Sequence, residues 1–222
     1  MADTGGYTGT LTSGGPPAIR TLPGLTITKV SVGPMDNNCY LLRCGTTGEQ
    51  LLIDAANDAD RLLALVGSSG LTTVVTTHQH WDHVQALEPV ATATGARTVA
   101  HPDDAPAIPV ATAELVRNGD VVRVGNVALR VIHLVGHTPG SIALLYEAPA
   151  GPDHLFTGDS LFPGGPGNTQ GDAARFTSLL DDLEAKVFGP LADDTWVYPG
   201  HGADTTLGAE RRSLPEWRER GW

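Results

Sequence analysis

Thr77-His78-Gln79-His80-Trp81-Asp82-His83 is the stretch of sequence on which the interpretation of this chain depends. It places three histidines and one aspartate within six residues, from His78 to His83. Imidazole and carboxylate groups are the usual protein ligands of zinc and other first-row transition ions. The stretch therefore predicts a metal site. It leaves open how many ions bind and which other residues complete their coordination.

The spacing of these ligands favours two neighbouring ions. The β-branched run Leu71–Thr76 predicts a strand that leads directly to His78. If the backbone stays extended for two more residues, His78 and His80 point to the same side, since side chains in a strand alternate. Asp82 and His83 follow where a tight turn would aim them at a second position. Four ligands this close in sequence cannot easily surround one tetrahedral ion.

Each pair of ligands then needs partners from elsewhere in the chain. Three candidates stand where a predicted strand gives way to a glycine-containing loop, a common place for functional residues: His137, Asp159 and His201. Taken singly they are weak candidates, because Gly-Asp and Gly-His pairs are common in turns. The dense cluster strengthens them, since it must be completed by something. The remaining histidines lack such a context and are predicted to be structural or on the surface: His101, His133 and His154.

Composition limits the classes of partner. The chain has 222 residues, of which 41% are hydrophobic, as expected for a globular protein with one sizeable core. Its 14 basic and 25 acidic residues give a formal net charge of −11, which argues against nucleic acid and anionic membrane surfaces as partners. No apolar run approaches the ~18 residues of a membrane span. The segment Met1–Arg20 lacks the features of a secretory signal, so a cytoplasmic location is expected.

The two cysteines are predicted to be packing residues. Cys39 and Cys44 fall in one predicted strand, about 16 Å apart at ~3.3 Å per residue, which is beyond disulfide reach. Their odd spacing also places them on opposite faces of that strand.

The predicted elements suggest layered sheets covered by helices. Residues 1–24, rich in Gly, Thr, Ser and Pro, are expected to form a loose arm before a single domain over residues 25–222. Strands are predicted over 25–32 (with one face buried), 38–43, 50–53, 71–76, 121–124, 127–134, 141–147, 154–157 and 195–198. Helices are predicted over 59–66, over 84–94 with an interruption or kink near Pro89, and over 173–188 with Asp172 as N-cap.

The histidine-rich stretch resembles the HxHxDH signature of the metallo-β-lactamase superfamily. The similarity extends to Asn38-Cys39-Tyr40-Leu41-Leu42 and to Leu52-Ile53-Asp54-Ala55, and so covers the chain from about Leu25 onward. The fold that this resemblance implies is a four-layer αββα sandwich, with two mixed β-sheets flanked by helices and the metals at one edge of the sheets.

The resemblance also implies a role for each candidate residue. His78, His80 and His137 would bind the first ion, Asp82, His83 and His201 the second, and Asp159 would bridge the two. Asp82 and Asp159 would then be the catalytic carboxylates, acting through two divalent ions, with zinc expected and iron or manganese as alternatives. Asp54 resembles an aspartate that orients a ligand histidine, although a strand-ending turn residue is an equally good interpretation.

The branch that the chain resembles most is that of the glyoxalase II-like hydrolases, in which a metal-bridging hydroxide attacks the carbonyl of a small thioester or ester. Two features depart from that branch: only 21 residues follow His201, too few for a helical glutathione-binding domain, and Asn168 stands where many relatives carry arginine. A mononuclear iron persulfide dioxygenase, using the equivalents of His137, Asp159 and His78 or a neighbour, is the alternative enzyme. A non-catalytic metal-binding module is the third reading. The substrate is expected to be a small molecule, and a homodimer stays open.

Overall fold

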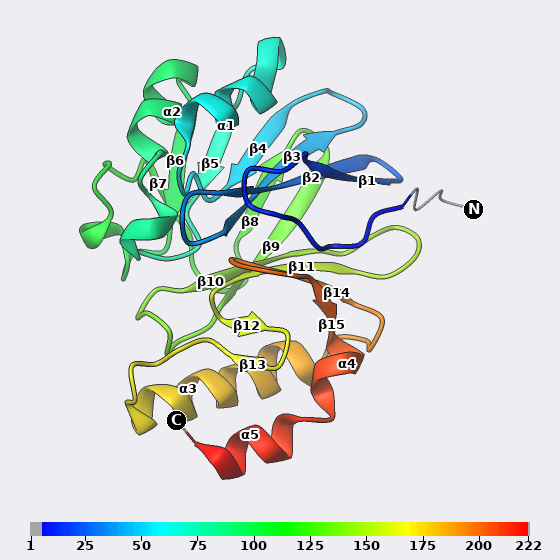
Figure 1. Ribbon diagram of the computed structural model, residues 1–222, viewed down its shortest axis with the longest axis vertical. Coiled ribbons are helices and arrows are strands. Elements are labelled where there is room, and N and C mark those ends of the chain that lie inside the picture. Colours follow the sequence, from blue (N-terminus) through cyan, green and yellow to red (C-terminus); the bar gives the residue numbers. More distant parts are fainter. Residues whose placement is uncertain (1–5, 222) are drawn as a thin grey trace.

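The fold is a four-layer sandwich of two mixed sheets between helices, as predicted (Figure 1). We describe residues 6–221 of a computed structural model. In Figure 1, α1 and α2 cover one outer face and α3, α4 and α5 lie at the other, with both sheets between them.

The first sheet is antiparallel where it starts and parallel where it ends. Its strands lie in chain order: β1 (Ala18–Leu22), β2 (Leu25–Val32), β3 (Asn37–Cys44), β4 (Gln50–Ile53), β5 (Thr73–Val75), β6 (Arg97–Ala100) and β7 (Glu114–Leu115). The pairs from β1 to β4 are antiparallel and those from β4 to β7 are parallel. Two parallel crossovers contain helices on its outer face, α1 (Ala59–Val66) and α2 (Leu87–Thr94).

The second sheet has the order β15-β14-β11-β10-β9-β8. Its strands are β8 (Val121–Val124), β9 (Val127–His133), β10 (Ile142–Tyr146), β11 (His154–Gly158), β14 (Trp196–Pro199) and β15 (Thr205–Thr206). Only β11 and β14 pair in parallel, and the chain between them carries the small hairpin β12 (Leu161–Phe162) and β13 (Gly165–Pro166) together with α3 (Ala173–Leu183). The chain ends in α4 (Leu207–Arg211) and α5 (Leu214–Arg220).

Three hydrophobic clusters correspond to the three interfaces between the four layers. One lies between the sheets, one under α1 and α2, and one under α3 and α5. Cys39 belongs to the cluster under α1 and α2, whereas Cys44 belongs to the cluster between the sheets. Both thiols are free and buried, so the predicted opposite orientation of the two cysteines is confirmed.

The helix predictions hold with two changes at helix ends. Asp172 caps α3 as predicted, because its carboxylate accepts hydrogen bonds from the amides of Ala174 and Arg175. The helix passes into a π-helical turn at Glu184–Phe188. The helix predicted over 84–94 is shorter, since α2 begins only at Leu87, and Pro89 lies in its first turn, where no helical N–H bond is lost and no kink is needed. Among residues 6–221, no helix is long and apolar enough to cross a membrane.

The prediction of a loose arm is wrong for the described part of residues 1–24, and residues 1–5 lie outside the described range. Residues 18–22 form β1, paired along its whole length with β2. Further upstream, the Tyr7 hydroxyl donates a 2.7 Å hydrogen bond to Asp204, and the Gly9 carbonyl accepts one from Lys29. This segment is poor in large apolar residues, and polar contacts with buried partners hold it in place instead.

β2 buries both of its faces, whereas the sequence predicted one. Leu25 and Ile27 point into the core between the sheets, but Val30 and Val32 belong to the opposite cluster. The alternation changes phase at Lys29, which keeps the inward direction of Leu25 and Ile27. A lysine fits there because its fully buried ammonium meets Asp204 at 2.6 Å and also donates to the carbonyls of Gly9 and Gly202.

We predict that Lys29→Met destabilises the fold by about 3–5 kcal/mol, because it leaves the buried Asp204 carboxylate without its cation. The measurement is urea unfolding of wild type and variant. Arg97→Met is the matched control, since the Arg97–Glu114 pair is half-exposed and should contribute no more than about 1 kcal/mol. Equal losses in the two variants would contradict this account of Lys29.

Candidate metal centre

All seven candidate residues lie at one edge of the two sheets, each just beyond a strand. His78 and His80 follow β5, and the next residues form a short 3-10 turn, Trp81–His83, that carries Asp82 and His83. The other three follow strands of the second sheet: His137 after β9, Asp159 after β11 and His201 after β14. The structure thus brings together residues that are up to 123 positions apart in sequence, from 78 to 201. Their role as ligands stays a prediction.

His78, His80 and His137 form a first triad. Each offers a ring nitrogen, and these atoms all lie within 4.8 Å of one another. The ring centroids are 4.8 Å apart for His78 and His80, 4.8 Å for His78 and His137, and 4.5 Å for His80 and His137. The rings meet edge to face, which suits three nitrogens that converge on one point.

Asp82, His83 and His201 form a second triad beside the first. The Nε2 atoms of His83 and His201 are 3.1 Å apart. The Oδ2 atom of Asp82 lies 3.6 Å from the first of these nitrogens and 3.3 Å from the second. The tight turn expected from the sequence is present as the 3-10 turn Trp81–His83, and it brings the ring of His83 to a centroid distance of 4.2 Å from that of His78, so the two triads are adjacent.

Asp159 lies between the two triads. Its Oδ1 atom is 3.4 Å from His83 Nε2, and its Oδ2 atom is 3.5 Å from His201 Nε2. The same Oδ2 atom is 3.6 Å from His137 Nε2 and 3.9 Å from His78 Nε2. One carboxylate therefore faces ring nitrogens of both triads, and we call the three parts together the metal centre.

Hydrogen bonds fix the tautomers of four of the five histidines. The Nδ1 atoms of His137 and His201 lie 2.8 Å from the carbonyls of Asn168 and Met35, which can only accept, so both Nδ1 atoms carry hydrogen. His83 Nδ1 lies 2.9 Å from the Asp54 carboxylate. Each Nε2 atom is left with a lone pair that faces the centre, the arrangement typical of metal-binding histidines.

Asp54 reaches the first triad as well. Its carboxylate accepts hydrogen bonds of 2.7 Å from both the amide and the hydroxyl of Thr77. That hydroxyl then accepts from His78 Nδ1 at 3.0 Å, so one buried aspartate orients a histidine in each triad. The alternative reading of Asp54 as a simple turn residue does not account for these contacts.

The donor set fits divalent metal ions. His78 Nε2, His137 Nε2 and Asp159 Oδ1 are buried and have no hydrogen-bond partner. Unpaired buried polar atoms are costly, unless an ion satisfies them. Glycine makes room for this packing, because a Cβ atom at Gly200 would overlap Asp159 Oδ1 and meet His83 Cε1 at 2.8 Å.

The two triads differ in protonation. Burial, together with nearby His83, lowers the pKa of His78 well below its usual range, and burial lowers the pKa of His137 to about 4. Burial also acts to lower the pKa values of His83 and His201, but the effect of nearby carboxylates is larger and raises them. Asp159 and Asp54 raise the pKa of His83, and Asp159 and Asp82 raise the pKa of His201 to about 9. The first triad is neutral at pH 7, whereas the metal-free second triad holds protons that an ion must displace.

Two supporting residues were missed by sequence reasoning. Asn37 donates a 2.9 Å hydrogen bond to Asp82 Oδ2. Asp104 is fully buried and accepts hydrogen bonds from the amide of Gln79, the hydroxyl of Thr138 and the amide of Gly140. It therefore joins the loop of His78 and His80 to the loop of His137. The only sequence signal for Asp104 is its position in a polar loop shortly after β6.

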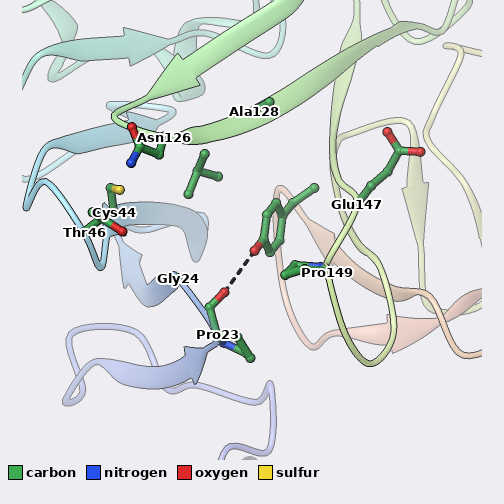
Figure 2. A pocket seen from close by; sticks show the side chains of 10 residues that line it. Pro23, Gly24, Cys44, Thr46, Asn126, Ala128, Glu147 and Pro149 are labelled. Atoms are coloured by element: carbon green, nitrogen blue, oxygen red, sulfur yellow. Dashed lines mark hydrogen bonds between the residues drawn. The ribbon is translucent and has the colours of Figure 1, made fainter.

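Two cavities are lined by residues other than the seven candidates. One, of about 430 Å³, includes the sequence neighbours Gln79 and Trp81 of the candidate His80 and is lined by Gln79, Trp81, Val84, Gln85, Glu88, Ala107 and Pro109. Another, of about 410 Å³, is shown in Figure 2, where Cys44 and Asn126 border it. The Tyr146 hydroxyl, which also lines it, donates a hydrogen bond to the Pro23 carbonyl. Asn37 and Cys44 mark the two ends of β3, about 23 Å apart at ~3.3 Å per residue. The cavity of Figure 2 is therefore remote from the metal centre.

Comparison with known proteins identifies the family. The model of the metallo-beta-lactamase superfamily matches residues 32–205, so the chain belongs to that superfamily. It is 38% identical over 169 residues to a hydroxyacylglutathione hydrolase from Polaromonas, covering 73% of this chain and 60% of that protein. ETHE1 from Myxococcus xanthus has a TM-score of 0.76 at 32% identity, covering 87% of this chain and 84% of the other. TTHA1623, solved in a di-iron-bound form, has a TM-score of 0.68 at 31% identity, covering 85% of this chain and 98% of the other.

We predict that Asp54→Ala weakens metal binding about 10–100-fold, the usual effect of removing a residue that orients a ligand. The measurement is a competitive zinc titration on protein whose fold is checked by circular dichroism. Asp60→Ala is the control, since Asp60 is exposed on α1. Unchanged affinity in a folded Asp54→Ala protein would show that His83 and His78 need no such support.

Proton release should accompany metal binding at the second triad. His201, with a pKa of about 9, is mostly protonated at pH 7, and a ligand nitrogen must give up that proton. Apparent affinity should therefore rise by up to about tenfold per pH unit between pH 7 and 9 for this one proton. In metal-free protein, whose His201 pKa is raised from 6.5, this protonation stabilises the fold most below pH 6.5, and the effect is lost as pH rises through 9.

Calorimetry in buffers of different ionisation enthalpy counts the released protons. His201→Ala should release fewer protons than wild type. The same proton count in both proteins would contradict the assignment of the raised pKa to His201.

Proposed function

We propose that this chain is a dinuclear metal-dependent hydrolase that acts on small thioesters or esters. The observation that carries the proposal is the position of Asp159, whose two oxygens lie 3.4–3.9 Å from ring nitrogens of both triads. A carboxylate that bridges two ions needs such a position. His78, His80 and His137 would hold one ion, and Asp82, His83 and His201 the other.

The second triad supports two ions over one. The Nδ1–H groups of His83 and His201 are already committed to Asp54 and to the Met35 carbonyl. Their Nε2 lone pairs therefore face each other at 3.1 Å, which is unfavourable unless a proton or a cation lies between them or nearby. The neighbouring carboxylates of Asp82 and Asp159 favour a cation at that place.

When bound, a pair of divalent ions would lower the pKa of water enough to supply hydroxide at neutral pH and would polarise a substrate carbonyl. The protein's own groups position and balance this charge. Asp82 and Asp159 offset two of the four positive charges, while Asn37 holds the Asp82 carboxylate in place. A serine nucleophile is not required for such a reaction, and the chain has no Gly-x-Ser-x-Gly motif.

The cavity beside Gln79 and Trp81 suits the part of the substrate that does not react. Trp81 stands between the ligands His80 and Asp82 in sequence, and 62% of its surface is exposed. A volume of about 430 Å³ matches a small molecule. The similarity to hydroxyacylglutathione hydrolase supports thioester chemistry, but that match covers only 60% of the hydrolase. We therefore propose the reaction type and leave the thiol carrier open.

An iron-dependent persulfide dioxygenase is the second candidate, favoured by the similarity to ETHE1 from Myxococcus xanthus. It would need one ion held mainly by the first triad and Asp159. Under that alternative the second triad would have no catalytic role.

Metal analysis and one variant test the proposal. Protein purified without added metal should contain two divalent ions per chain and hydrolyse members of a thioester, ester and lactone panel. Asp159→Ala should lower both metal content and turnover, the latter by about 100-fold or more, since it removes the bridge. Asp193→Ala, at an exposed aspartate, is the control and should leave both unchanged.

Other outcomes would overturn the proposal. One iron per chain, with oxygen consumed when glutathione persulfide is added, would establish the dioxygenase. Full metal content and turnover in Asp159→Ala would show that this residue does not bridge.

A further inference from the structure

The loop that carries His201 is held across the two sheets. It follows β14 of the second sheet, and its carbonyl groups accept hydrogen bonds from β2 and β3 of the first. The Asn38 amide donates to the Gly200 carbonyl at 2.7 Å, and the Asn38 side chain donates to the Gly202 carbonyl at 2.9 Å. The Gly202 carbonyl accepts a second hydrogen bond, of 2.8 Å, from Lys29. The residues on either side of His201 are thus fixed from the opposite sheet.

His201 depends on this support more than its partners in the second triad do. Its side chain is 22% exposed, whereas the side chains of Asp82 and His83 are 9% and 0% exposed. Less of the His201 ring is confined by packing. Its one hydrogen bond away from the centre goes to the Met35 carbonyl, in the turn between β2 and β3. The position of the ring is therefore set largely by the backbone of its own loop.

The Lys29 ammonium is itself fixed on three sides. It donates to the carbonyls of Gly9 and Gly202, each at 2.8 Å. It also donates to Asp204 Oδ1 at 2.6 Å, so all three of its N–H groups are used. Asp204 Oδ2 in turn accepts a 2.7 Å hydrogen bond from the Tyr7 hydroxyl. The first described residues of the chain thus complete the surroundings of a lysine that contacts the loop of His201.

We propose that Lys29 is a positioning residue for His201, and that residues 7–9 keep it in place. The proposal rests on the proposed function, because its expected effect is on the second of two ions. Lys29 acts through the Gly202 carbonyl, one residue after His201. Residues that orient a metal ligand change metal affinity by about 10–100-fold. Loss of the ammonium should weaken the second ion and spare the first, whose histidines lie on other loops.

A double variant separates this role from fold stability. Lys29→Met alone leaves the Asp204 carboxylate buried without its cation, so instability would obscure an effect on the ion. Lys29→Met combined with Asp204→Asn removes both charges. The Gly9 carbonyl then keeps the amide of residue 204 as a donor, and the Gly202 carbonyl keeps Asn38. The double variant should therefore be more stable than Lys29→Met, yet still lack the tether from β2 to the loop of His201.

A competitive zinc titration tests the proposal. The double variant should bind the second ion at least about tenfold more weakly than wild type and the first ion with unchanged affinity. Gln50→Leu is the matched control, because the buried Gln50 side chain also donates to two carbonyls, those of Val66 and Gly70. Gln50 begins β4, whereas Asp54 follows the other end of that strand. The control should melt at a lower temperature but retain both affinities.

Hydrogen exchange of metal-free protein gives a second readout that needs no ion. The Asn38 amide, bonded to the Gly200 carbonyl, should exchange at least about tenfold faster in the double variant than in wild type. In Gln50→Leu it should keep its wild-type rate relative to the other amides of β3. If wild type binds only one ion, the dinuclear function fails, while this exchange still decides whether Lys29 holds the loop.

Two results would overturn the positioning role. One is wild-type affinity for the second ion, or wild-type exchange at Asn38, in the folded double variant. The other applies if that variant fails to fold. Because coupled equilibria are reciprocal, zinc that fills the second triad of wild type should slow exchange of the Asp204 amide, which donates to the Gly9 carbonyl at 3.1 Å. No slowing there would show that the loop of His201 and the contacts of Lys29 are independent.

Discussion

The arrangement of the centre depends on the electrostatic interaction between one buried carboxylate, that of Asp159, and the histidines around it. Asp159 is only 11% exposed, and four ring nitrogens lie within 3.9 Å of its oxygens. Burial alone would raise the pKa of this carboxyl, but the surrounding histidines, His83 foremost, hold it well below its usual range. The fold therefore keeps a negative charge at the junction of the two sheets. That charge would attract the cations proposed for the site, and without them the cluster would be a costly group of buried polar residues.

The supporting residues hold this geometry from both sheets. Asp54 ends a strand of the first sheet and orients His83 directly and His78 through Thr77. Asp104 ties the loop of His78 and His80 to the loop of His137, which leaves the second sheet. The candidate ligands thus follow strand ends, where the backbone is rigid, and most are then held by a hydrogen bond from elsewhere in the chain. Such over-determination is what a site needs if its ligands are to hold position when ions bind and leave.

Local patterns in the sequence were enough to predict much of this. The spacing from His78 to His83, the β-branched runs and the glycine-containing loops after strands indicated layered sheets covered by helices and the seven candidates, all of which the structure places together. The four-layer sandwich itself followed from the resemblance to the metallo-β-lactamase superfamily. Asn37 and Asp104 could not be found in this way, because an asparagine or aspartate in a loop has no local signature for a partner many residues away. Lys29 was misread for the same reason, since only Asp204, 175 residues later, makes an inward lysine acceptable. Residues 18–22 were missed because a short edge strand has little apolar pattern of its own.

The charge balance of the second triad bears on the proposed number of ions. In a mononuclear enzyme, Asp82, His83 and His201 would remain as a metal-free cluster. There the raised pKa values of His83 and His201 would keep protons between them at neutral pH. Nothing in the first triad resembles this, because His78 and His137 have lowered pKa values and lie with unpaired Nε2 atoms toward Asp159. An ion in the first triad alone would leave His83 and His201 competing with it, as two cations, for the same Asp159 carboxylate. A second ion would replace those protons and share the carboxylate, so the position of Asp159 between the triads supports the proposed pair of ions.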